Sequence, residues 1–101
     1  NQSGIAVGCV SPTGLVHPDQ FSWDVVVGDV RKNSFAEIWG GDNPELAPYR
    51  QRPRAIEGRC RECQWYDMCN GGLRVRAVSA TDDFSAPDPA CYLTDAEVAL
   101  R

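Results

Sequence analysis

GRCRECQWYDMCNGG, residues 58–72, holds three of the five cysteines of this 101-residue chain. A fourth cysteine follows 22 positions after the third, so the four form the pattern C-x2-C-x5-C-x21-C. A gap of two residues lets both thiolates of a pair turn toward one centre, and it therefore recurs at metal sites. The cysteine count is odd and no basic-then-apolar signal opens the sequence, which disfavours a disulfide framework. The pattern predicts a thiolate-bound metal at Cys60, Cys63, Cys69 and Cys91.

The spacing of these cysteines bears on which metal they bind. Zinc and iron–sulfur clusters both accept four thiolates. Two-knuckle zinc sites have two C-x2-C pairs, whereas here only Cys60 and Cys63 form such a pair. The wide and uneven gaps to Cys69 and Cys91 suit a cubic cluster, which is larger than one ion. We therefore expect one [4Fe–4S] cluster, with a zinc-stabilised interaction module as the alternative.

The composition indicates a small domain with many loops. Nine glycines and seven prolines suggest a thin core that needs a metal or disulfide to hold it. The net charge of −4 argues against nucleic acid as a partner. No apolar run approaches the roughly 20 residues that span a bilayer, so no membrane association is expected. Because the chain begins at Asn1 and not at methionine, we expect a fragment of a longer protein. We expect that protein in the cytoplasm, where thiols stay reduced.

The first half of the sequence predicts a hairpin and two short helices. Residues 4–18 combine two apolar stretches with a Ser-Pro-Thr-Gly turn, which is typical of a β-hairpin. Residues 21–30 are aromatic and β-branched, but Gly28-Asp29 interrupts them. Capping residues, glycines and prolines delimit one helix over 34–39 and another over 44–51.

The second half is predicted to be loop-like around the cysteines, with one helical turn after Cys69. Thr94 and Glu97 have the spacing of a capping box, which should begin a C-terminal helix. Together the elements predict an irregular α+β domain over 1–101. Its expected parts are a hairpin and strand (1–32), short helices (33–53), cluster-binding loops (54–93) and a C-terminal helix (94–101).

The order of these parts resembles the SPASM domain, the C-terminal auxiliary iron–sulfur domain of many radical SAM enzymes. The resemblance is carried by residues 11–18, 28–31, 34–39 and 58–72 and by the last cysteine. A full SPASM domain holds two auxiliary clusters on seven cysteines, and this sequence departs from that pattern.

The departures concern the first of those two clusters. Leu73 stands four residues after Cys69, and Asp19 stands five residues after Gly14, where the family pattern has cysteines. All four positions for the second cluster are filled. The resemblance therefore implies a single auxiliary cluster that is fully ligated by protein.

Within that family, residues 17–21, 69–77 and 86–95 resemble the enzymes of heme d1 biosynthesis. This implies removal of propionate side chains from a tetrapyrrole, with a peptide-modifying maturase as the alternative. The radical SAM core would lie upstream and bind S-adenosylmethionine and a second cluster at a C-x3-C-x2-C motif, which this chain lacks. The chain alone is expected to be inactive. Its expected partners are that core and a tetrapyrrole or peptide substrate, and its cluster would serve electron transfer, structure or both.

His17, Arg74 and Arg76 are candidate substrate-binding residues. An imidazole can donate to a carboxylate or move a proton, and guanidinium groups grip the carboxylates of a tetrapyrrole. Each residue also has a structural interpretation: a hydrogen-bonded hairpin histidine, or arginines that tune the field of the cluster or pair with acids. Cys9 is in phase with Ile5 in the predicted strand, and we expect a buried, inert thiol there.

Overall fold

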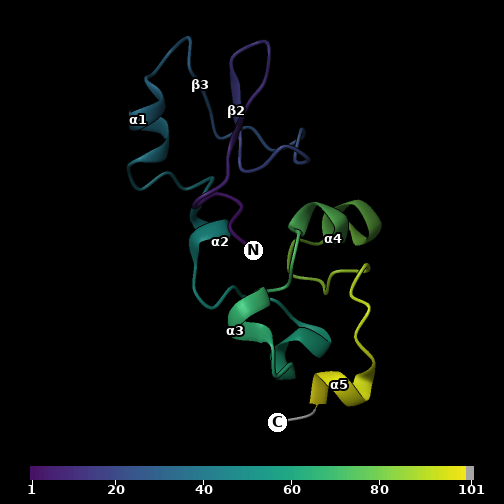
Figure 1. Ribbon diagram of the computed structural model, residues 1–101. Helices are drawn as coiled ribbons and strands as arrows, with labels where there is room; N and C mark the ends of the chain where they lie inside the picture. The colour runs from purple at the N-terminus through teal and green to yellow at the C-terminus, as the bar shows by residue number, and fades with distance from the viewer. Residues whose placement is uncertain (100–101) are drawn as a thin grey trace. The chain divides into compact units, whose positions relative to one another are not determined.

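The computed structural model describes residues 1–99, which form two compact units (Figure 1). The N-terminal unit, Gln2–Gln51, contains β1 (Cys9–Val10), β2 (Leu15–His17), β3 (Gly28–Asp29), α1 (Phe35–Trp39) and α2 (Ala47–Arg50). The cysteine-rich unit comprises Asn1 and the described residues from Arg52 onward. It contains the 3₁₀ helix η1 (Gly58–Glu62), α3 (Tyr66–Cys69), α4 (Arg74–Thr81) and α5 (Asp95–Ala99). The expected α+β class is confirmed.

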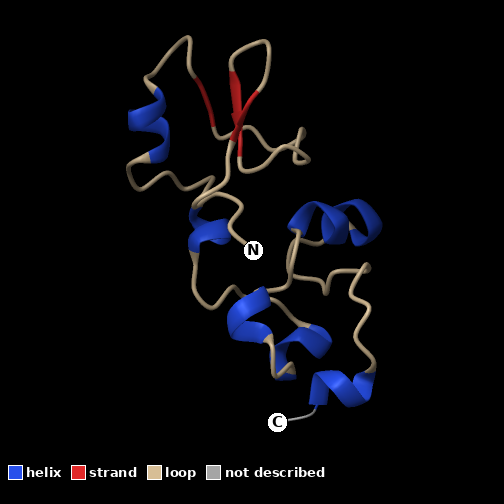
Figure 2. Ribbon diagram, in the orientation of Figure 1, coloured by secondary structure: helices blue, strands red, loops and turns tan. Residues whose placement is uncertain are grey.

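The three strands form one antiparallel sheet in the order β1-β2-β3, drawn in red in Figure 2. Cys9 lies opposite His17, as expected for the hairpin. The paired part of the first strand is shorter than predicted, because residues 2–7 form a turn in which the Gln2 carbonyl accepts three backbone N–H groups. Gly4 has a φ of +78° in this turn, a conformation that glycine adopts without strain.

The third strand lies at the Gly-Asp pair that was expected to interrupt the sequence, so that expectation is wrong. Gly28 pairs with Val16, and Asp29 pairs with Leu15. A Cβ on Gly28 would lie 2.6 Å from Ile38 Cγ2. The glycine is therefore present because α1 packs directly on the strand backbone.

The N-terminal unit has an apolar core between the sheet and its helices. Ser34 begins α1 as predicted, since its Oγ accepts the Glu37 N–H at 3.2 Å. Asn43 joins the sheet to α1 by donating to the carbonyls of Val27 and Ile38. The buried core residues are Val16, Val27, Ile38 and Leu46, with Val25 and Trp39 packed against them.

The cysteine-rich unit is more helical than the sequence predicts. The single expected turn after Cys69 is the eight-residue helix α4, and α3 precedes it. The sequence of α4 lacks the regular spacing of apolar residues that is typical of a helix, because its buried residues are Arg74 and Ala77. The capping box at Thr94 begins α5 as predicted, and residues 100–101 of the expected helix lie outside the described residues.

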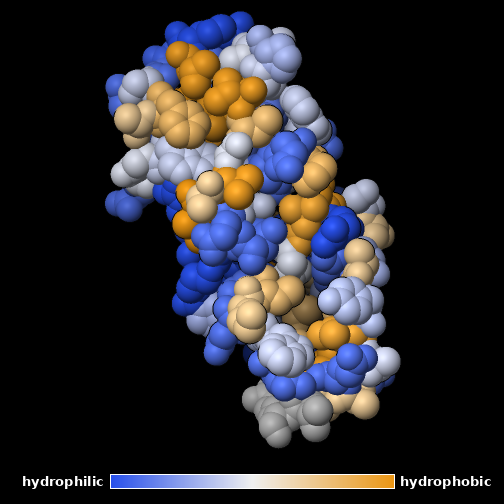
Figure 3. All heavy atoms as spheres, in the orientation of Figure 1, coloured by the Kyte–Doolittle hydropathy of each residue, from blue (hydrophilic) through white to orange (hydrophobic). Residues whose placement is uncertain are grey.

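Apolar side chains also lie on the surface of the molecule, as Figure 3 shows in orange. The largest exposed fractions among the large hydrophobic residues belong to Tyr92 (91%) and Met68 (76%), both beside the cysteines. None of the helices in the described part of the chain is long and apolar enough to cross a membrane.

Candidate metal centre

The first cysteine pair is held by η1 and the turn that follows it. Cys60 lies inside η1, and the Cys63 amide donates to its carbonyl at 3.2 Å. The Trp65 backbone N–H then donates to Cys63 Sγ at 3.4 Å. Gly58 begins η1 with a φ of +69°, and a Cβ there would lie 2.9 Å from Pro87. A glycine is therefore needed where the C-x2-C pair approaches the loop around Pro87.

Cys69 is the last residue of α3, and three residues with positive φ follow it. Asn70, Gly71 and Gly72 have φ values of 49°, 80° and 68°. Asparagine and glycine are the residues that adopt this left-handed region most readily. The buried Asn70 side chain also accepts the Arg54 N–H at 2.9 Å. The Asn-Gly-Gly sequence thus reverses the chain directly after the third cysteine.

Cys91 lies on an exposed loop that two charged residues hold. The Asp88 carbonyl accepts the Cys91 N–H at 3.1 Å, and the Asp88 carboxylate accepts the Ala90 N–H at 2.9 Å. Arg59 donates to Cys91 Sγ at 3.4 Å and to the Leu93 carbonyl at 2.8 Å. A cationic donor therefore faces the sulfur of the fourth cysteine.

These four cysteines line a single cavity of about 550 Å³ in the cysteine-rich unit. Cys60 and Cys63 are half-buried, whereas Cys69 and Cys91 are exposed. The apolar part of its wall includes Trp65, Tyr66, Met68, Tyr92 and Leu93. The cavity is thus largely apolar apart from its thiols and the charged side chains of Arg76, Asp88 and Glu97.

The four thiols of the cavity fit the ligand set of an iron–sulfur cluster. All five cysteines are free of disulfides. Each thiolate of such a cluster binds a different iron, so its four protein ligands surround a shared space.

Burial and nearby charges act on the pKa of Cys60 and of Asp88 in this cavity. Burial raises the pKa of the Cys60 thiol above its ordinary value, and the Asp88 backbone N–H and the Arg74 guanidinium offset only part of that shift. Burial also raises the pKa of the Asp88 carboxyl, but hydrogen bonds from Arg76 and from the Ala90 N–H outweigh it and hold that pKa below its ordinary value. Asp88 therefore stays ionised beside the cysteines and keeps Arg76 in place.

The two arginines predicted to bind substrate have different surroundings on α4. Arg76 lines the cavity, and its Nη2 lies 2.6 Å from Asp88 Oδ2. Arg74 is only 1% exposed. Its guanidinium donates to three backbone carbonyl oxygens, those of Gly71, Phe84 and Ala86. Of the two, Arg76 is the one that a bound molecule can reach, whereas Arg74 faces the backbone of its own chain.

His17, the third candidate, is buried in the N-terminal unit with an exposed fraction of 2%. Its Nδ1 donates to the Val25 carbonyl at 2.8 Å. Nε2 has no hydrogen-bond partner among the described residues, and the Trp23 ring lies 5.2 Å away. These contacts fix the imidazole inside the fold.

Asp19 stands where the family pattern has a cysteine, and its carboxylate is saturated with hydrogen bonds. One oxygen accepts the Ser3 hydroxyl at 2.7 Å, and the other accepts the Ser22 hydroxyl at 2.8 Å. The backbone N–H groups of Phe21 and Ser22 complete the set at 2.9 Å each. We call this group of contacts the Asp19 clamp. Its hydrogen bonds hold the loop around Asp19.

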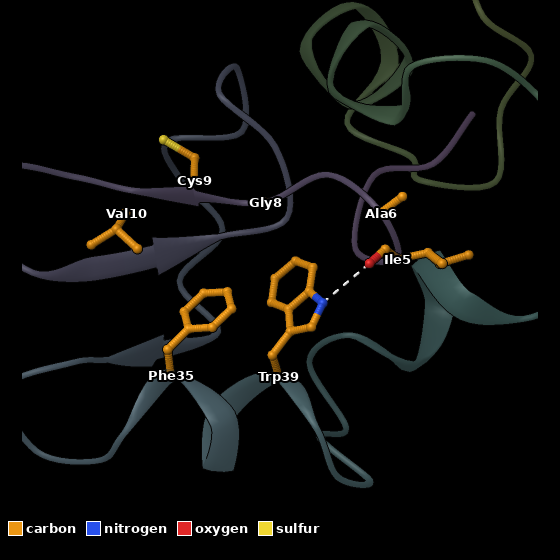
Figure 4. A pocket seen from close by; sticks show the side chains of 7 residues that line it. All are labelled: Ile5, Ala6, Gly8, Cys9, Val10, Phe35 and Trp39. Carbon is orange, nitrogen blue, oxygen red and sulfur yellow. Dashed lines mark hydrogen bonds between the residues drawn. The ribbon is translucent and has the colours of Figure 1, made fainter.

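Cys9 is half-buried and not fully buried as expected. It lies at a hollow of about 230 Å³ in the N-terminal unit, which also borders Val10, Phe35 and Trp39. Figure 4 shows its side chain directed away from the two aromatic rings, and the Trp39 Nε1 donating to the Ile5 carbonyl at 3.1 Å. Cys9 does not line the cavity that contains the other four cysteines.

Sequence reasoning missed the role of Arg59. It adjoins Cys60 in the sequence, but it donates to the sulfur of Cys91, 32 residues away. No local pattern predicts that pairing. The left-handed turn after Cys69, in contrast, has a signal, because Asn-Gly pairs are typical of such turns.

Comparison with known proteins agrees with this geometry. Residues 1–64 match the SPASM family, described as an iron–sulfur cluster-binding domain. The pre-heme d1 synthase of Dinoroseobacter shibae is 45% identical over 97 residues, which cover 96% of this chain and 24% of that protein. The Fe-coproporphyrin III synthase of Methanosarcina barkeri is 46% identical over 102 residues, covering 97% and 26%. A PqqA peptide cyclase of Granulibacter bethesdensis is 34% identical over 91 residues, covering 86% and 24%.

The chain thus spans about a quarter of the length of these curated relatives. The resemblance to heme d1 enzymes is confirmed, since the two heme-related proteins match at higher identity than the peptide cyclase. The cofactor of the matched family is an iron–sulfur cluster, and the zinc alternative finds no support. Because the family match covers more than half of the sequence, the chain belongs to the SPASM family of iron–sulfur cluster-binding domains.

Proposed function

We propose that Cys60, Cys63, Cys69 and Cys91 bind one [4Fe–4S] cluster, and that the chain is the auxiliary domain of a radical SAM enzyme acting on a tetrapyrrole. The observation that carries the proposal is that these four cysteines line one cavity, which Cys9 does not. Four thiolates saturate the irons of such a cluster, so no iron is left open for substrate. When bound, the cluster supplies one-electron transfer and a covalent link between the loops.

Residues of the chain support a redox role by donating to the sulfurs. The Trp65 N–H faces Cys63, Arg59 faces Cys91, and a backbone N–H from Asp88 reaches Cys60. Hydrogen bonds to ligand sulfurs disperse negative charge and thereby favour the reduced form of a cluster. Since Cys69 and Cys91 are exposed, a redox partner can approach that side.

The proposed substrate class is supported by the names of two relatives, a pre-heme d1 synthase and an Fe-coproporphyrin III synthase. A tetrapyrrole with carboxylate side chains needs cationic partners, and Arg76 at the cavity is the candidate we retain. We assign His17 and Arg74 to holding the fold, because both are buried and hydrogen-bonded to backbone carbonyls. The proposal places the radical SAM core upstream and the enzyme in the cytoplasm, where thiols stay reduced.

Anaerobic reconstitution of the full-length protein tests the ligand set. Each of the four cysteines is changed to serine in turn, with Cys9→Ser as the matched control. Iron and sulfide content and the EPR spectrum after reduction are then compared with those of the parent. We expect one cluster to be lost in each of the four variants and retained in the control. Loss of a cluster in the control, or equal iron and sulfide content in the parent and in the four variants, would overturn the assignment.

A peptide-modifying maturase is the second candidate, because the PqqA peptide cyclase match covers 86% of the chain. Binding of Fe-coproporphyrin III and of a PqqA-type peptide to the reconstituted full-length protein discriminates the two. We expect the tetrapyrrole to bind more tightly, and to bind less well after Arg76→Gln. Tighter binding of the peptide would favour the maturase.

A further inference from the structure

Arg74 is among the most completely buried side chains of the molecule, with an exposed fraction of 1%. Its Nη1 donates to the carbonyls of Phe84 and Ala86 at 2.7 and 2.6 Å, and its Nη2 donates to the carbonyl of Gly71. The guanidinium carbon also lies 5.9 Å from the centre of the Phe84 ring. A buried cation thus joins two separate backbone segments.

Each of those segments leads to a proposed ligand. Gly71 is two residues after Cys69, and Ala86 is five residues before Cys91. The approach is close, because a Cβ on Gly71 would lie 2.7 Å from Arg74 Nη2. The planar fork of an arginine is suited to span carbonyls on two sides in fixed geometry. The side chain therefore sets how the Cys69 turn and the loop before Cys91 are spaced.

The charge of Arg74 has no salt-bridge partner within residues 1–99. Asp88 interacts electrostatically with Arg74, but its salt bridge is with Arg76. Arg74 also interacts electrostatically with the sulfurs of Cys60 and Cys69. An unpaired buried charge is costly, and it becomes favourable when an anion forms beside it. A cluster with four thiolates is such an anion.

We propose that Arg74 is the positioning residue of the cluster site: its fork fixes the spacing of the Cys69 and Cys91 segments, and its buried charge offsets the negative charge of the bound cluster. This inference rests on the proposed function. The geometry of the guanidinium determines how firmly the cluster is retained, and its charge sets part of the reduction potential.

Two substitutions separate these contributions. Arg74→Lys keeps the charge, but a single ammonium nitrogen cannot bridge the three carbonyls as the fork does. Arg74→Gln removes the charge and shortens the side chain. The matched control is Arg31→Gln in the N-terminal unit, because Arg31 is exposed, is paired with Asp29 and does not line the cluster cavity.

The measurements use the full-length protein after anaerobic reconstitution. The rate of iron release to a chelator reports retention, and an EPR-monitored redox titration reports the midpoint potential. Spectra of the Cys63→Ala variant are subtracted, so that only the cluster of this chain contributes. If Arg74→Gln does not fold, the release rate and potential of Arg74→Lys still test the geometry.

We expect both Arg74 variants to retain the cluster about 10- to 100-fold less well, as is typical for residues that support metal ligands. The potential should stay near the parent value in Arg74→Lys and fall in Arg74→Gln, while Arg31→Gln changes neither quantity. Parent-like retention in both Arg74 variants, equal potentials in the lysine and glutamine variants, or an equal effect of Arg31→Gln would overturn the inference. Equal cluster content in the parent and in Cys63→Ala would instead overturn the proposed function.

Discussion

The two units differ in what they bury. In the N-terminal unit, the sheet and helices enclose an apolar core of four side chains, Val16, Val27, Ile38 and Leu46. The buried hydrophobic residues of the described cysteine-rich unit are Ile56, Ala77 and Val98, and its buried polar residues are Arg54, Asn70 and Arg74. Each fully buried Val, Leu or Ile side chain contributes about 1.5–3 kcal/mol. The cysteine-rich unit therefore has less hydrophobic stabilisation available.

The same difference is visible where the family pattern places its two clusters. At the first, Asp19 stands at a cysteine position of the family pattern and holds its loop by hydrogen bonds. At the second, the cysteines line an open cavity, and the left-handed turn after Cys69 is linked to the rest by Arg54 and Arg74. We therefore expect the N-terminal unit to fold on its apolar core and the cysteine-rich unit to depend more on a bound metal.

Of the changes that affect the two units differently, Cys63→Ala should have the largest effect. We expect loss of the cluster absorbance near about 400 nm and loss of backbone protection over residues 54–93, because metal binding supplies much of the folding free energy of such a site. The N-terminal unit should keep its protection. Absorbance spectra and residue-resolved hydrogen exchange of the reconstituted protein measure both effects.

The control for that experiment is Cys9→Ala in the N-terminal unit. Cys9 is half-buried and does not line the cluster cavity, so the absorbance should be unchanged. Loss of the absorbance in this variant, or full protection of residues 54–93 in Cys63→Ala, would show that the two units do not differ in the way we describe.

Leu46→Ala should have the next largest effect, and in the opposite unit. Leu46 is completely buried in the apolar core, and such truncations cost about 2–5 kcal/mol. We expect the N-terminal unit to unfold at a lower urea concentration, as measured by hydrogen exchange. The iron content should stay at the parent level. Loss of iron in step with that unfolding would mean that the units are not independent.

The sequence predicted those parts of the fold that depend on local chemistry. The hairpin, the Ser34 cap of α1 and the Thr94 capping box each rest on residues a few positions apart. It did not predict β3, because Gly28 is needed for packing against Ile38, ten residues away. Nor did it predict α4, whose buried Arg74 hides the apolar face by which such a helix is normally found.

Contacts between residues distant in the sequence also limited the prediction of the candidate site. Cysteine spacing was sufficient to predict four residues that the structure brings to one cavity, and their role as ligands stays a prediction. Which donors face the sulfurs depends on contacts between distant segments, such as Arg59 with Cys91. His17 and Arg74 were selected by residue type alone, and burial was the property that the sequence did not reveal.

Asp19→Asn tests the clamp that takes the place of a metal ligand. The substituted amide presents an NH₂ group to donors that require an acceptor, so at least one buried hydrogen bond is lost at a cost of about 1–3 kcal/mol. The N-terminal unit should unfold earlier in urea, and the iron content should not change. An unaltered urea midpoint would mean that the Asp19 clamp does not stabilise the loop.

Asp88→Asn should have a smaller effect, confined to the cysteine-rich unit. The carboxylate holds Arg76 and caps the loop before Cys91, and the amide keeps part of that bonding. We expect about tenfold faster iron release to a chelator, the lower end for residues that support metal ligands. Asp29→Asn is the matched control, because it breaks an exposed Asp–Arg pair in the N-terminal unit and should leave the release rate unchanged.

The smallest effect concerns the Asp29–Arg31 pair itself and depends on pH. Hydrogen bonds from Arg31 lower the pKa of Asp29 to about 2. Because this pKa lies below its value of about 3.9 in an unfolded chain, the pair stabilises the N-terminal unit above about pH 4 and loses that contribution as the pH falls toward 2. Comparing urea midpoints of the parent and Asp29→Asn from pH 7 to pH 3 should show a small, constant difference down to about pH 4 that shrinks below it. A difference that grows on acidification would mean that the folded state does not favour the charged carboxylate. The screening of an exposed pair explains why this contact ranks below the buried Asp19 clamp of the same unit.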